Sequence, residues 1–262
     1  MNENERTATF RRLHAPGELL ILPNAWDAWS ARIVETCGAP AIATTSAAVA
    51  WSLGYPDGDA VPPKTVARMI ESIARVLSVP LTVDCEGGYS DDPARVGEHV
   101  RDFVNAGAAG INLEDSTSSP ELLAAKIEAA KRTGVFVNAR VDVLLKQLVP
   151  REQAIEEIIA RAARYRDAGT DGIFVPLLSD PKEIETVVRA IDPLPLNVMA
   201  VPGLATAPEL KRLGVRRLSA GPAVARAAIN ITRQLAAGFL ADGNSDALYE
   251  HHGEKIDMNA LF

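Results

Sequence analysis

The sequence predicts a single (β/α)8 barrel, because short apolar runs and amphipathic helical segments alternate eight times along its 262 residues. No linker rich in Pro, Gly or Ser and no low-complexity segment breaks this alternation. Strands that alternate with helices form parallel sheets, and eight of them favour a closed barrel over a doubly wound open sheet. We therefore expect one domain over residues 1–262.

The apolar runs give the expected strands in order, which are 19–23, 39–44, 81–84, 110–114, 135–140, 172–175, 196–199 and 215–219. Each run is followed by a polar or Gly-containing turn. The segment 65–77 is typical of the intervening helices, because its apolar residues recur at steps of three and four. The segments 106–110 and 168–172 each place a glycine where a helix must end before the next strand.

A long apolar helix is expected at 222–240, after the eighth strand. It is longer than closing the barrel requires. We therefore expect the C-terminal helical segment 222–262 to pack on a neighbouring subunit, in a homo-oligomer such as a dimer or a tetramer.

Composition restricts the possible partners. The net charge is −7 and no block of Lys or Arg is present, so the chain lacks the basic surface that nucleic acid or an anionic membrane would require. The N-terminus is charged and polar, and no apolar run reaches the ~18 residues of a membrane helix. We expect a cytoplasmic protein that acts on a small molecule.

Several common kinds of active site are excluded. The two cysteines, Cys37 and Cys85, lie in segments expected to be buried and lack metal-binding spacing, so we expect them in the core. The histidines lie outside the predicted strand ends, which leaves no Ser-His-Asp triad; they are His14, His99, His251 and His252. The loops 201–203 and 220–222 fit either a phosphate cradle or plain turns.

The segment 81–89 carries the strongest functional signal, because an apolar strand ends in Asp84 and Glu86. Side chains alternate along a strand, so these two acids share one face and Cys85 takes the other. Burying carboxylates is costly unless a cation or hydrogen-bond donors accompany them. Other polar residues follow the neighbouring segments in the same way: Asp57, Glu114, Asp115, Asn138, Arg140 and Asp142.

In a (β/α)8 barrel these residues meet at the carboxyl ends of the strands. Two carboxylates ~5 Å apart at an effective dielectric of ~20 repel by about 3 kcal/mol, so the cluster needs a divalent cation. Oxygen ligands without His or Cys favour Mg²⁺, or Mn²⁺, over zinc. The planar fork of Arg140 suits a substrate oxygen. Asp115 and Asp142 either cap the next helix or support the site.

The chain resembles the isocitrate lyase and phosphoenolpyruvate mutase superfamily over nearly its whole length. The segments that carry the resemblance are 22–27 with 30–32, Thr44-Thr45-Ser46-Ala47, 53–58, 83–89, Asn112-Leu113-Glu114-Asp115, and Asn138-Ala139-Arg140-Val141-Asp142. The resemblance implies a barrel of that type and enzymes that act on 2-oxo acids, with Mg²⁺ stabilising an enolate.

The resemblance also implies roles for individual residues. Asp84 would ligate the metal, and Asp57, Glu86 and Glu114 would hold it mainly through water. Arg140, with Asn138 beside it, would orient the oxo acid, and the backbone of Thr45, Ser46 and Ala47 would bind its carboxylate. The catalytic residues would be Arg140, Glu114 and Asp57.

Two departures from the superfamily narrow the activity. Isocitrate and methylisocitrate lyases carry a Lys-Lys-Cys-Gly-His loop after the fourth strand, whose cysteine is the acid, whereas here Ser116-Thr117-Ser118-Ser119-Pro120 follows Asp115. The lysine-bearing gate loop of the phosphonate enzymes is missing from the same place. The pattern favours a Mg²⁺-dependent lyase that cleaves a C–C bond of a small 2-oxo acid through a metal-stabilised pyruvate enolate.

Oxaloacetate decarboxylation and retro-aldol cleavage both fit this reaction. Decarboxylation tolerates the missing cysteine better, because it needs no strong acid at the leaving group, whereas retro-aldol cleavage needs a base such as Glu114, Asp115 or a metal-bound water. Two alternatives stay open. One is C–P chemistry of the phosphonopyruvate hydrolase or phosphoenolpyruvate mutase type, and the other is a barrel that binds a 2-oxo acid without turning it over.

Overall fold

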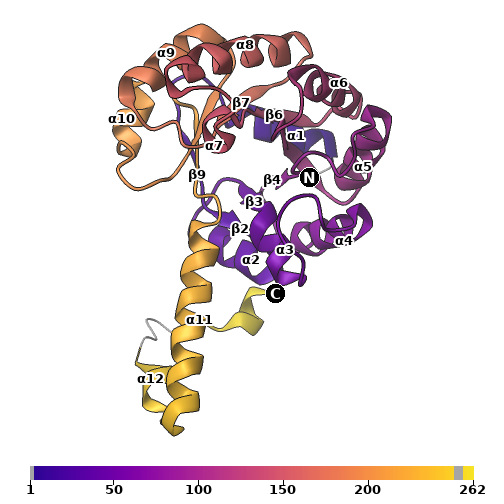
Figure 1. Cartoon of the computed structure of the whole chain (residues 1–262). Helices are drawn as coiled ribbons and strands as arrows, with labels where there is room; N and C mark the ends of the chain where they lie inside the picture. The colour runs from indigo at the N-terminus through magenta and orange to yellow at the C-terminus, as the bar shows by residue number, and fades with distance from the viewer. Residues whose placement is uncertain (1–2, 251–255) are drawn as a thin grey trace.

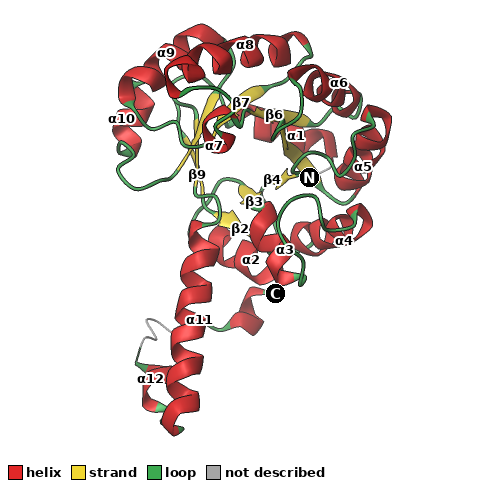
Figure 2. Ribbon diagram, viewed as in Figure 1, coloured by secondary structure: helices red, strands yellow, loops and turns green. Residues whose placement is uncertain are grey.

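Parallel strands form a nearly closed barrel surrounded by helices in the computed structural model, which describes residues 3–250 and 256–262 (Figures 1 and 2). The strand order is β1-β9-β8-β7-β6-β5-β4-β3-β2. The pieces β1 and β2 are separated only by Pro23, and β1 pairs with β9 while β2 pairs with β3. One stretch of chain therefore joins both edges of the sheet, and the predicted (β/α)8 barrel is confirmed.

The strands are β1 (Leu20–Leu22), β2 (Asn24–Ala25), β3 (Ile42–Thr44), β4 (Leu81–Asp84), β5 (Ala108–Glu114), β6 (Phe136–Arg140), β7 (Gly172–Val175), β8 (Leu196–Met199) and β9 (Arg217–Ser219). The helices are α1 (Glu3–Arg12), α2 (Ala28–Thr36), α3 (Ser46–Ser52), α4 (Pro63–Ala74), α5 (Pro93–Asn105), α6 (Pro120–Lys131), α7 (Val143–Lys146), α8 (Ala154–Asp167), α9 (Pro181–Ile191), α10 (Ala207–Arg212), α11 (Ala223–Asp242) and α12 (Asp246–Tyr249). All eight predicted strands are present.

Local sequence explains where the outer helices begin. In α9 the side chain of Asp180 accepts hydrogen bonds from the N–H groups of Lys182 and Glu183, and Pro181 occupies the first helical position. A short acceptor followed by proline satisfies donors that the first turn leaves free. Asp92 before α5 and Ser119 before α6 do the same. These signals fix the helix starts independently of the barrel.

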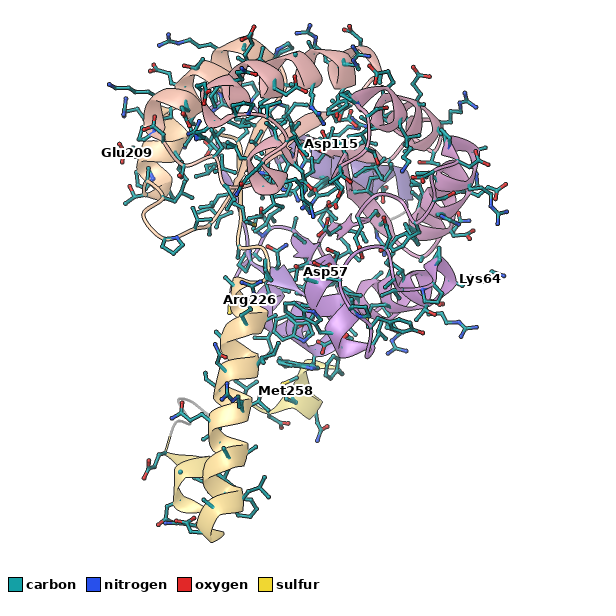
Figure 3. All side chains as sticks on the ribbon, in the orientation of Figure 1. Asp57, Lys64, Asp115, Glu209, Arg226 and Met258 are labelled. Atoms are coloured by element: carbon teal, nitrogen blue, oxygen red, sulfur yellow. The ribbon has the colours of Figure 1, made fainter. Side chains whose placement is uncertain are left out.

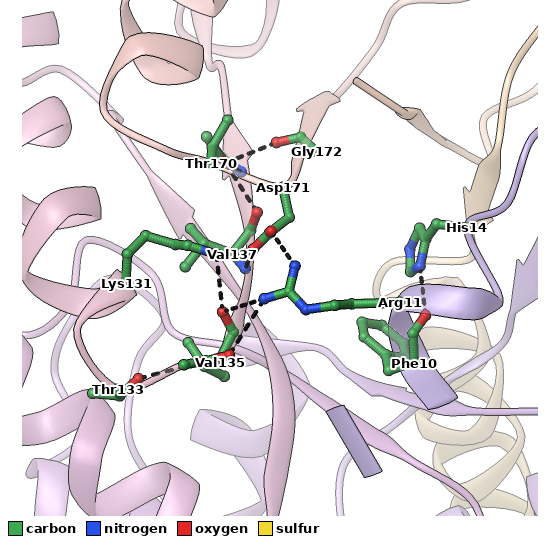
Figure 4. Close-up of polar contacts among 12 residues, drawn as sticks. Phe10, Arg11, His14, Lys131, Thr133, Val135, Val137, Thr170, Asp171 and Gly172 are labelled. Atoms are coloured by element: carbon green, nitrogen blue, oxygen red, sulfur yellow. Dashed lines mark hydrogen bonds and ion pairs between the residues drawn. The ribbon is translucent and has the colours of Figure 1, made fainter. Parts of the chain in front are cut away.

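The N-terminal end of the barrel is closed by α1, which the sequence did not predict. Phe10 of this helix is fully buried against residues at the beginnings of the strands, including Leu20 and Phe136. Arg11 forms an ion pair with Asp171, and Lys131 approaches the same carboxylate at 2.5 Å (Figure 4). The plug leaves the opposite end of the barrel as the place where a ligand can enter.

His14 follows α1 and is buried beside this plug. Its ring stacks on Phe136 at a centroid distance of 4.4 Å, and Nδ1 donates to the carbonyl of Phe10 at 2.9 Å (Figure 4). Burial lowers the pKa of His14 to about 3, and the charge of Arg217 acts in the same direction. His14 is therefore neutral at physiological pH.

A layer of polar side chains lies inside the barrel. Asn138 donates to Asn112 at 3.0 Å and to Asn197 at 3.1 Å, and Arg217 donates to Asn112 at 3.3 Å. All four side chains are buried. Burial lowers the pKa of Arg217 to about 10, opposed by the charge of Asp84. The barrel interior therefore carries amide and guanidinium groups beneath its open end.

The helix α11 extends away from the barrel, as the orange ribbon in Figure 1 shows. The predicted long helix at 222–240 is confirmed. Ala225 is its single buried residue, whereas Ile229, Ile231, Phe239 and Leu240 are exposed. Packing of this segment on a neighbouring subunit stays a prediction.

Over the described ranges, no helix combines the length and apolar character that crossing a bilayer requires.

One cysteine assignment was wrong. Cys37 is exposed, because it caps the C-terminal end of α2, whereas Cys85 is buried as expected. His251 and His252 lie outside the described residues.

The buried neutral His14 predicts a specific pH dependence of stability. The unfolded chain binds a proton at His14 below its ordinary pKa of 6.5, and the folded chain does so only below about 3. Stability is therefore present above pH 6.5 and is lost as pH falls towards 3. We expect His14→Phe, which keeps the ring stacking, to lessen this loss by about 1.4 kcal/mol per pH unit. Urea unfolding at pH 7.5, 6.5, 5.5 and 4.5 gives the free energy of unfolding of both proteins. The same pH dependence of that free energy in the parent protein and in His14→Phe would contradict the prediction.

Candidate active site

A cavity of about 470 Å³ opens at the carboxyl ends of the strands. Its lining combines polar and apolar residues: Asn24, Thr45, Ser46, Ala47, Asp57, Asp84, Asn112, Arg140, Leu145, Phe174, Pro176, Leu177, Met199, Ala200, Val201, Pro202, Ser219, Ala220, Gly221, Pro222, Ala223 and Arg226. A groove of about 710 Å³ beside α7 is larger, but Arg151 is its single charged lining residue. The smaller cavity is therefore the candidate active site.

Asp84, the last residue of β4, presents one free oxygen to this region. Its Oδ2 accepts hydrogen bonds from the N–H of Ser46 at 3.1 Å and from the Ser46 hydroxyl at 2.8 Å. Its own N–H donates to the hydroxyl of Thr44 at 2.9 Å. Oδ1 is buried and has no hydrogen-bond partner among the described residues. A buried carboxylate oxygen without a donor is costly, so this atom fits a bound cation.

Glu86 reaches the site by a different route from the one predicted. β4 ends at Asp84, and Glu86 has a left-handed backbone with φ 49°, so strand alternation does not place the two acids together. Its carboxylate accepts a hydrogen bond from the N–H of Asp59. Burial raises the pKa of Glu86 to about 7, and the nearby charges of Asp59, Asp84 and Asp57 also raise it. A turn, and not strand alternation, therefore brings Glu86 close enough to Asp84 for their charges to influence each other.

The loop that carries Asp57 is attached to this turn through Asp59. The Asp59 carboxylate accepts a hydrogen bond from the N–H of Tyr89 at 3.1 Å. A Cβ atom at Gly87 would lie 2.7 Å from Oδ2 of the same carboxylate, so a larger residue there would require the Asp59 side chain to shift. Asp57 lines the cavity and is exposed, in agreement with its predicted place near the site (Figure 3).

Arg140, the last residue of β6, is bound by two carboxylates. Its Nε and Nη2 donate to Asp142 at 2.7 and 3.0 Å, and Nη1 lies 2.5 Å from Glu114. Burial opposes its charge, but Glu114 and Asp142 outweigh that effect and raise the pKa of Arg140. Burial raises the pKa of Glu114 well above its ordinary value, against the effect of Arg140. Asp142 thus pairs with Arg140, and its side chain forms no capping bond on α7.

Asp115 is a buried structural centre of the site. Its carboxylate accepts hydrogen bonds from Tyr165 at 2.7 Å, from Arg161 at 2.9 Å and from the N–H of Asp142 at 2.8 Å. The helix that follows is capped by Ser119 instead, so the capping alternative for Asp115 is wrong. The three bonds join the end of β5 to α8 and to the end of β6.

The structure brings most of the predicted substrate-binding residues to the cavity. Thr45, Ser46, Ala47 and Arg140 line it. Asn138 does not line the cavity, because it is buried (2% exposed). Its side chain instead donates to Asn112, which does line the cavity. Glu86 and Glu114 lie beside the cavity and outside its lining.

Sequence reasoning missed several lining residues. Asn24 donates to the carbonyl of Thr44 at 2.7 Å and accepts from the N–H of Gly221 at 2.8 Å, so it ties the start of the barrel to the loop before α11. An apolar wall was also missed; it consists of Phe174, Pro176, Leu177, Met199 and Val201. The polar residues inside the otherwise apolar runs were a usable signal for Asn112, but nothing local marks the apolar wall.

The donor set fits Mg²⁺ in part. The buried, unpartnered Oδ1 of Asp84 is an oxygen ligand of the kind that Mg²⁺ prefers, and Asp57 supplies a second carboxylate in the same lining. Among the described residues, no three Asp, Glu, His or Cys side chains are close enough to chelate one ion directly. An ion held by few carboxylates and otherwise by water agrees with this arrangement.

A family model for phosphoenolpyruvate phosphomutase matches residues 10–240 of this chain. The chain belongs to the phosphoenolpyruvate mutase and isocitrate lyase superfamily. This superfamily member is 43% identical over 220 residues to an uncharacterized protein of Mycobacterium tuberculosis strain H37Rv, covering 81% of each chain. It is 30% identical over 235 residues to the oxaloacetate decarboxylase of Pseudomonas entomophila strain L48, covering 85% of this chain and 81% of that protein.

Solved structures of the superfamily share the fold. The crystal structure of phosphonopyruvate hydrolase in complex with oxalate and Mg²⁺ is 25% identical, with a TM-score of 0.85, and the match covers all of this chain (100%) and 95% of that one. The superfamily thus includes relatives named for C–C and for C–P chemistry, and a relative that binds Mg²⁺.

The contacts of Asp115 predict a large loss of stability when its charge is removed. Asp115→Asn leaves Arg161 without its buried partner and turns an acceptor into a donor, so we expect the free energy of unfolding to fall by about 3–5 kcal/mol. Glu157→Gln removes the other, half-exposed partner of Arg161 and should cost at most about 1 kcal/mol. Urea unfolding of both variants provides the comparison, and equal small losses would show that Asp115 has no special structural role.

Proposed function

We propose that this superfamily member is a Mg²⁺-dependent lyase that cleaves a C–C bond of a small 2-oxo acid and leaves the enolate of pyruvate. The observation that carries the proposal is the free Oδ1 of Asp84, held beside a cavity that also contains Arg140 and the first turn of α3. When bound, Mg²⁺ would supply the positive charge that stabilises an enolate oxygen.

The protein residues then have separate tasks. The hydroxyl and N–H of Ser46 hold Asp84 in one orientation, since both donate to the same oxygen. Thr45 and Ala47 flank Ser46 in the lining, and the backbone of this turn would receive the substrate carboxylate. Arg140 also lines the cavity, and its orientation is fixed by Glu114 and Asp142. Catalysis would thus depend on positioned groups whose geometry is set before the substrate binds.

Decarboxylation of oxaloacetate is better supported than retro-aldol cleavage. A retro-aldol reaction needs a base for the substrate hydroxyl. Asp115 accepts three hydrogen bonds and lies outside the cavity lining, while Glu114 is paired with Arg140, so a metal-bound water is left of the three candidate bases. Decarboxylation requires no such base, and it requires no acid in place of the missing cysteine. Cys85 could not replace that cysteine, because it is fully buried in the core. The similarity to an oxaloacetate decarboxylase points the same way.

The test is pyruvate release from oxaloacetate, a 4-hydroxy-2-oxo acid, methylisocitrate and phosphonopyruvate, each with Mg²⁺ and with EDTA. Metal-dependent pyruvate from one of the first two substrates supports the proposed lyase. Turnover of phosphonopyruvate without oxaloacetate would instead assign C–P chemistry, which the family model and the similarity to phosphonopyruvate hydrolase keep as the second candidate. Binding without any product would assign a non-catalytic barrel.

Removing the proposed ligand should abolish the metal response. We expect Asp84→Ala to fold normally, because its side chain lies at the barrel mouth, and to lose at least about 100-fold in Mg²⁺ affinity, more than the loss usual for groups that only support a ligand. Glu128→Ala, an exposed acid on α6, should bind Mg²⁺ like the parent protein. Calorimetric titration with Mg²⁺ and circular dichroism test both points; unchanged affinity in Asp84→Ala would refute the ligand assignment.

We also propose that α11 packs on a second copy of this chain in a dimer or tetramer. Its exposed apolar side chains include Leu240, which is 85% exposed, and single isolated chains rarely leave such a helix uncovered. Phe239→Asp combined with Leu240→Asp should therefore lower the oligomeric state, whereas Asn230→Asp should not. Sedimentation velocity at micromolar concentration measures this, and a parent protein that is monomeric there would contradict the proposal.

A further inference from the structure

Lys126 is a buried lysine on α6, with a side chain that is 5% exposed. Its ammonium group donates to the carbonyl of Gly87 at 2.8 Å. Within the described part of the chain, Lys126 forms one ion pair, with the carboxylate of Asp91, which lies 3.6 Å away and is 90% exposed. A carboxylate in water compensates little of a buried charge. An apolar residue would pack at lower cost, so the charge of Lys126 requires another explanation.

The carbonyl of Gly87 belongs to a turn at residues 86–89, the metal-side turn, which follows β4 and carries Glu86. Glu86 has a left-handed backbone with φ 49°, a conformation that costs on the order of 1–3 kcal/mol in a residue other than glycine. A second side chain holds the same turn, since Nδ1 of His99 on α5 donates to the carbonyl of Gly88 at 3.0 Å. Side chains from two outer helices therefore support a strained backbone.

The metal-side turn anchors a loop at residues 57–59, the metal-side loop, which reaches the cavity lining. The N–H of Asp59 donates to the carboxylate of Glu86, and the carboxylate of Asp59 accepts from the N–H of Tyr89 at 3.1 Å. Two acids thus meet where the loop joins the turn, and Asp59 is also left-handed, with φ 55°. Burial raises the pKa of Asp59, whereas the hydrogen bond from Tyr89 and the positive charge of Lys126 lower it. Lys126 therefore supplies positive charge to a junction where acids gather.

The backbone fixes the start of the metal-side turn, and Lys126 fixes its middle. The N–H of Glu114, on β5, donates to the carbonyl of Glu86 at 2.9 Å. The carbonyl of Gly87 is bound from α6 instead, where Lys126 is its donor. A methionine at position 126 would fill a similar space but would supply neither the donor nor the charge. The lysine is thus required for what its ammonium group binds, and packing would not preserve that contact.

We infer that Lys126 is a positioning residue for the proposed Mg²⁺ site: it holds the metal-side turn in place, and the turn holds the metal-side loop with its Asp57 at the cavity. The contacts run from the ammonium group to Gly87, and from the turn to Asp59, two residues after Asp57. Lys126 itself lies outside the cavity lining. The inference rests on the proposed function, because it concerns the affinity of the site for Mg²⁺.

Removing the ammonium group should weaken the metal site while Asp84 stays in place. We expect Lys126→Met to lower Mg²⁺ affinity by about 10-fold, the lower end of the loss usual for groups that support metal ligands. Lys126→Arg keeps the charge and the donors, so it should lose less than Lys126→Met. Isothermal titration calorimetry with Mg²⁺ alone measures each affinity, and circular dichroism shows whether each variant folds. If Lys126→Met does not fold, Lys126→Gln carries the same expectation.

Hydrogen–deuterium exchange of the metal-free protein gives a second readout. Peptides that cover the metal-side loop and the metal-side turn should exchange faster in Lys126→Met, because the N–H groups of Asp59 and Tyr89 lose protection when the junction loosens. The peptide that covers Ser46 should be unchanged, since its N–H donates to Asp84 independently of the turn. Faster exchange in the junction alone would show that the effect is local.

Lys131→Met is the matched control, because Lys131 lies five residues further along α6 and pairs with Asp171 at the opposite end of the barrel (Figure 4). It should change neither the Mg²⁺ affinity nor the exchange of the metal-side loop. Unchanged Mg²⁺ affinity in Lys126→Met, or an equal loss in both variants, would overturn the inference and leave the proposed lyase intact. A parent protein that binds no Mg²⁺ would overturn the proposed function and the inference together.

Discussion

Acidic residues gathered at one end of the barrel impose the constraint on which the rest of the structure depends. Each carboxylate that leaves water must gain a donor or a cation, or its pKa rises. Asp115 gains Arg161 and Tyr165, while Glu114 and Asp142 share Arg140. Glu86 accepts a hydrogen bond from the N–H of Asp59, and Asp84 is satisfied at one oxygen only. Among the described residues, the Oδ1 atom of Asp84 is therefore a buried oxygen that an external cation could bind.

The structural ion pairs and the candidate active site are parts of the same network. Asp115 joins β5 to α8 and accepts a bond from the backbone of Asp142, which in turn orients Arg140. Asp115 is therefore connected to the cavity through Asp142 and Arg140. The site is thus supported by contacts that also hold the outer helices on the barrel, which is the arrangement that rigid positioning of catalytic groups requires.

The two ends of the barrel differ in a way that assigns them different roles. At the N-terminal end, Phe10 and His14 fill the opening with aromatic contacts. At the other end the strands finish in polar residues, and the layer formed by Asn112, Asn138, Asn197 and Arg217 lies between the two. Relatives named for decarboxylation and for phosphonate hydrolysis share this fold. The shared fold therefore does not by itself specify the reaction, which depends on the residues around the mouth of the barrel.

The sequence by itself determined the barrel and the strand positions, and it indicated Asp84 as a candidate metal ligand. These follow from local patterns, because apolar periodicity and turn residues act over a few neighbouring positions. Only the tertiary structure decided that Glu86 arrives through a left-handed turn, that Asp115 is a buried centre, that α1 closes the barrel, and that Arg226 faces the cavity. Each of those depends on groups far apart in the chain, such as Asp59 with Glu86 and Arg226 with Trp51. Such pairs are formed by loop and helix packing, which local periodicity does not encode.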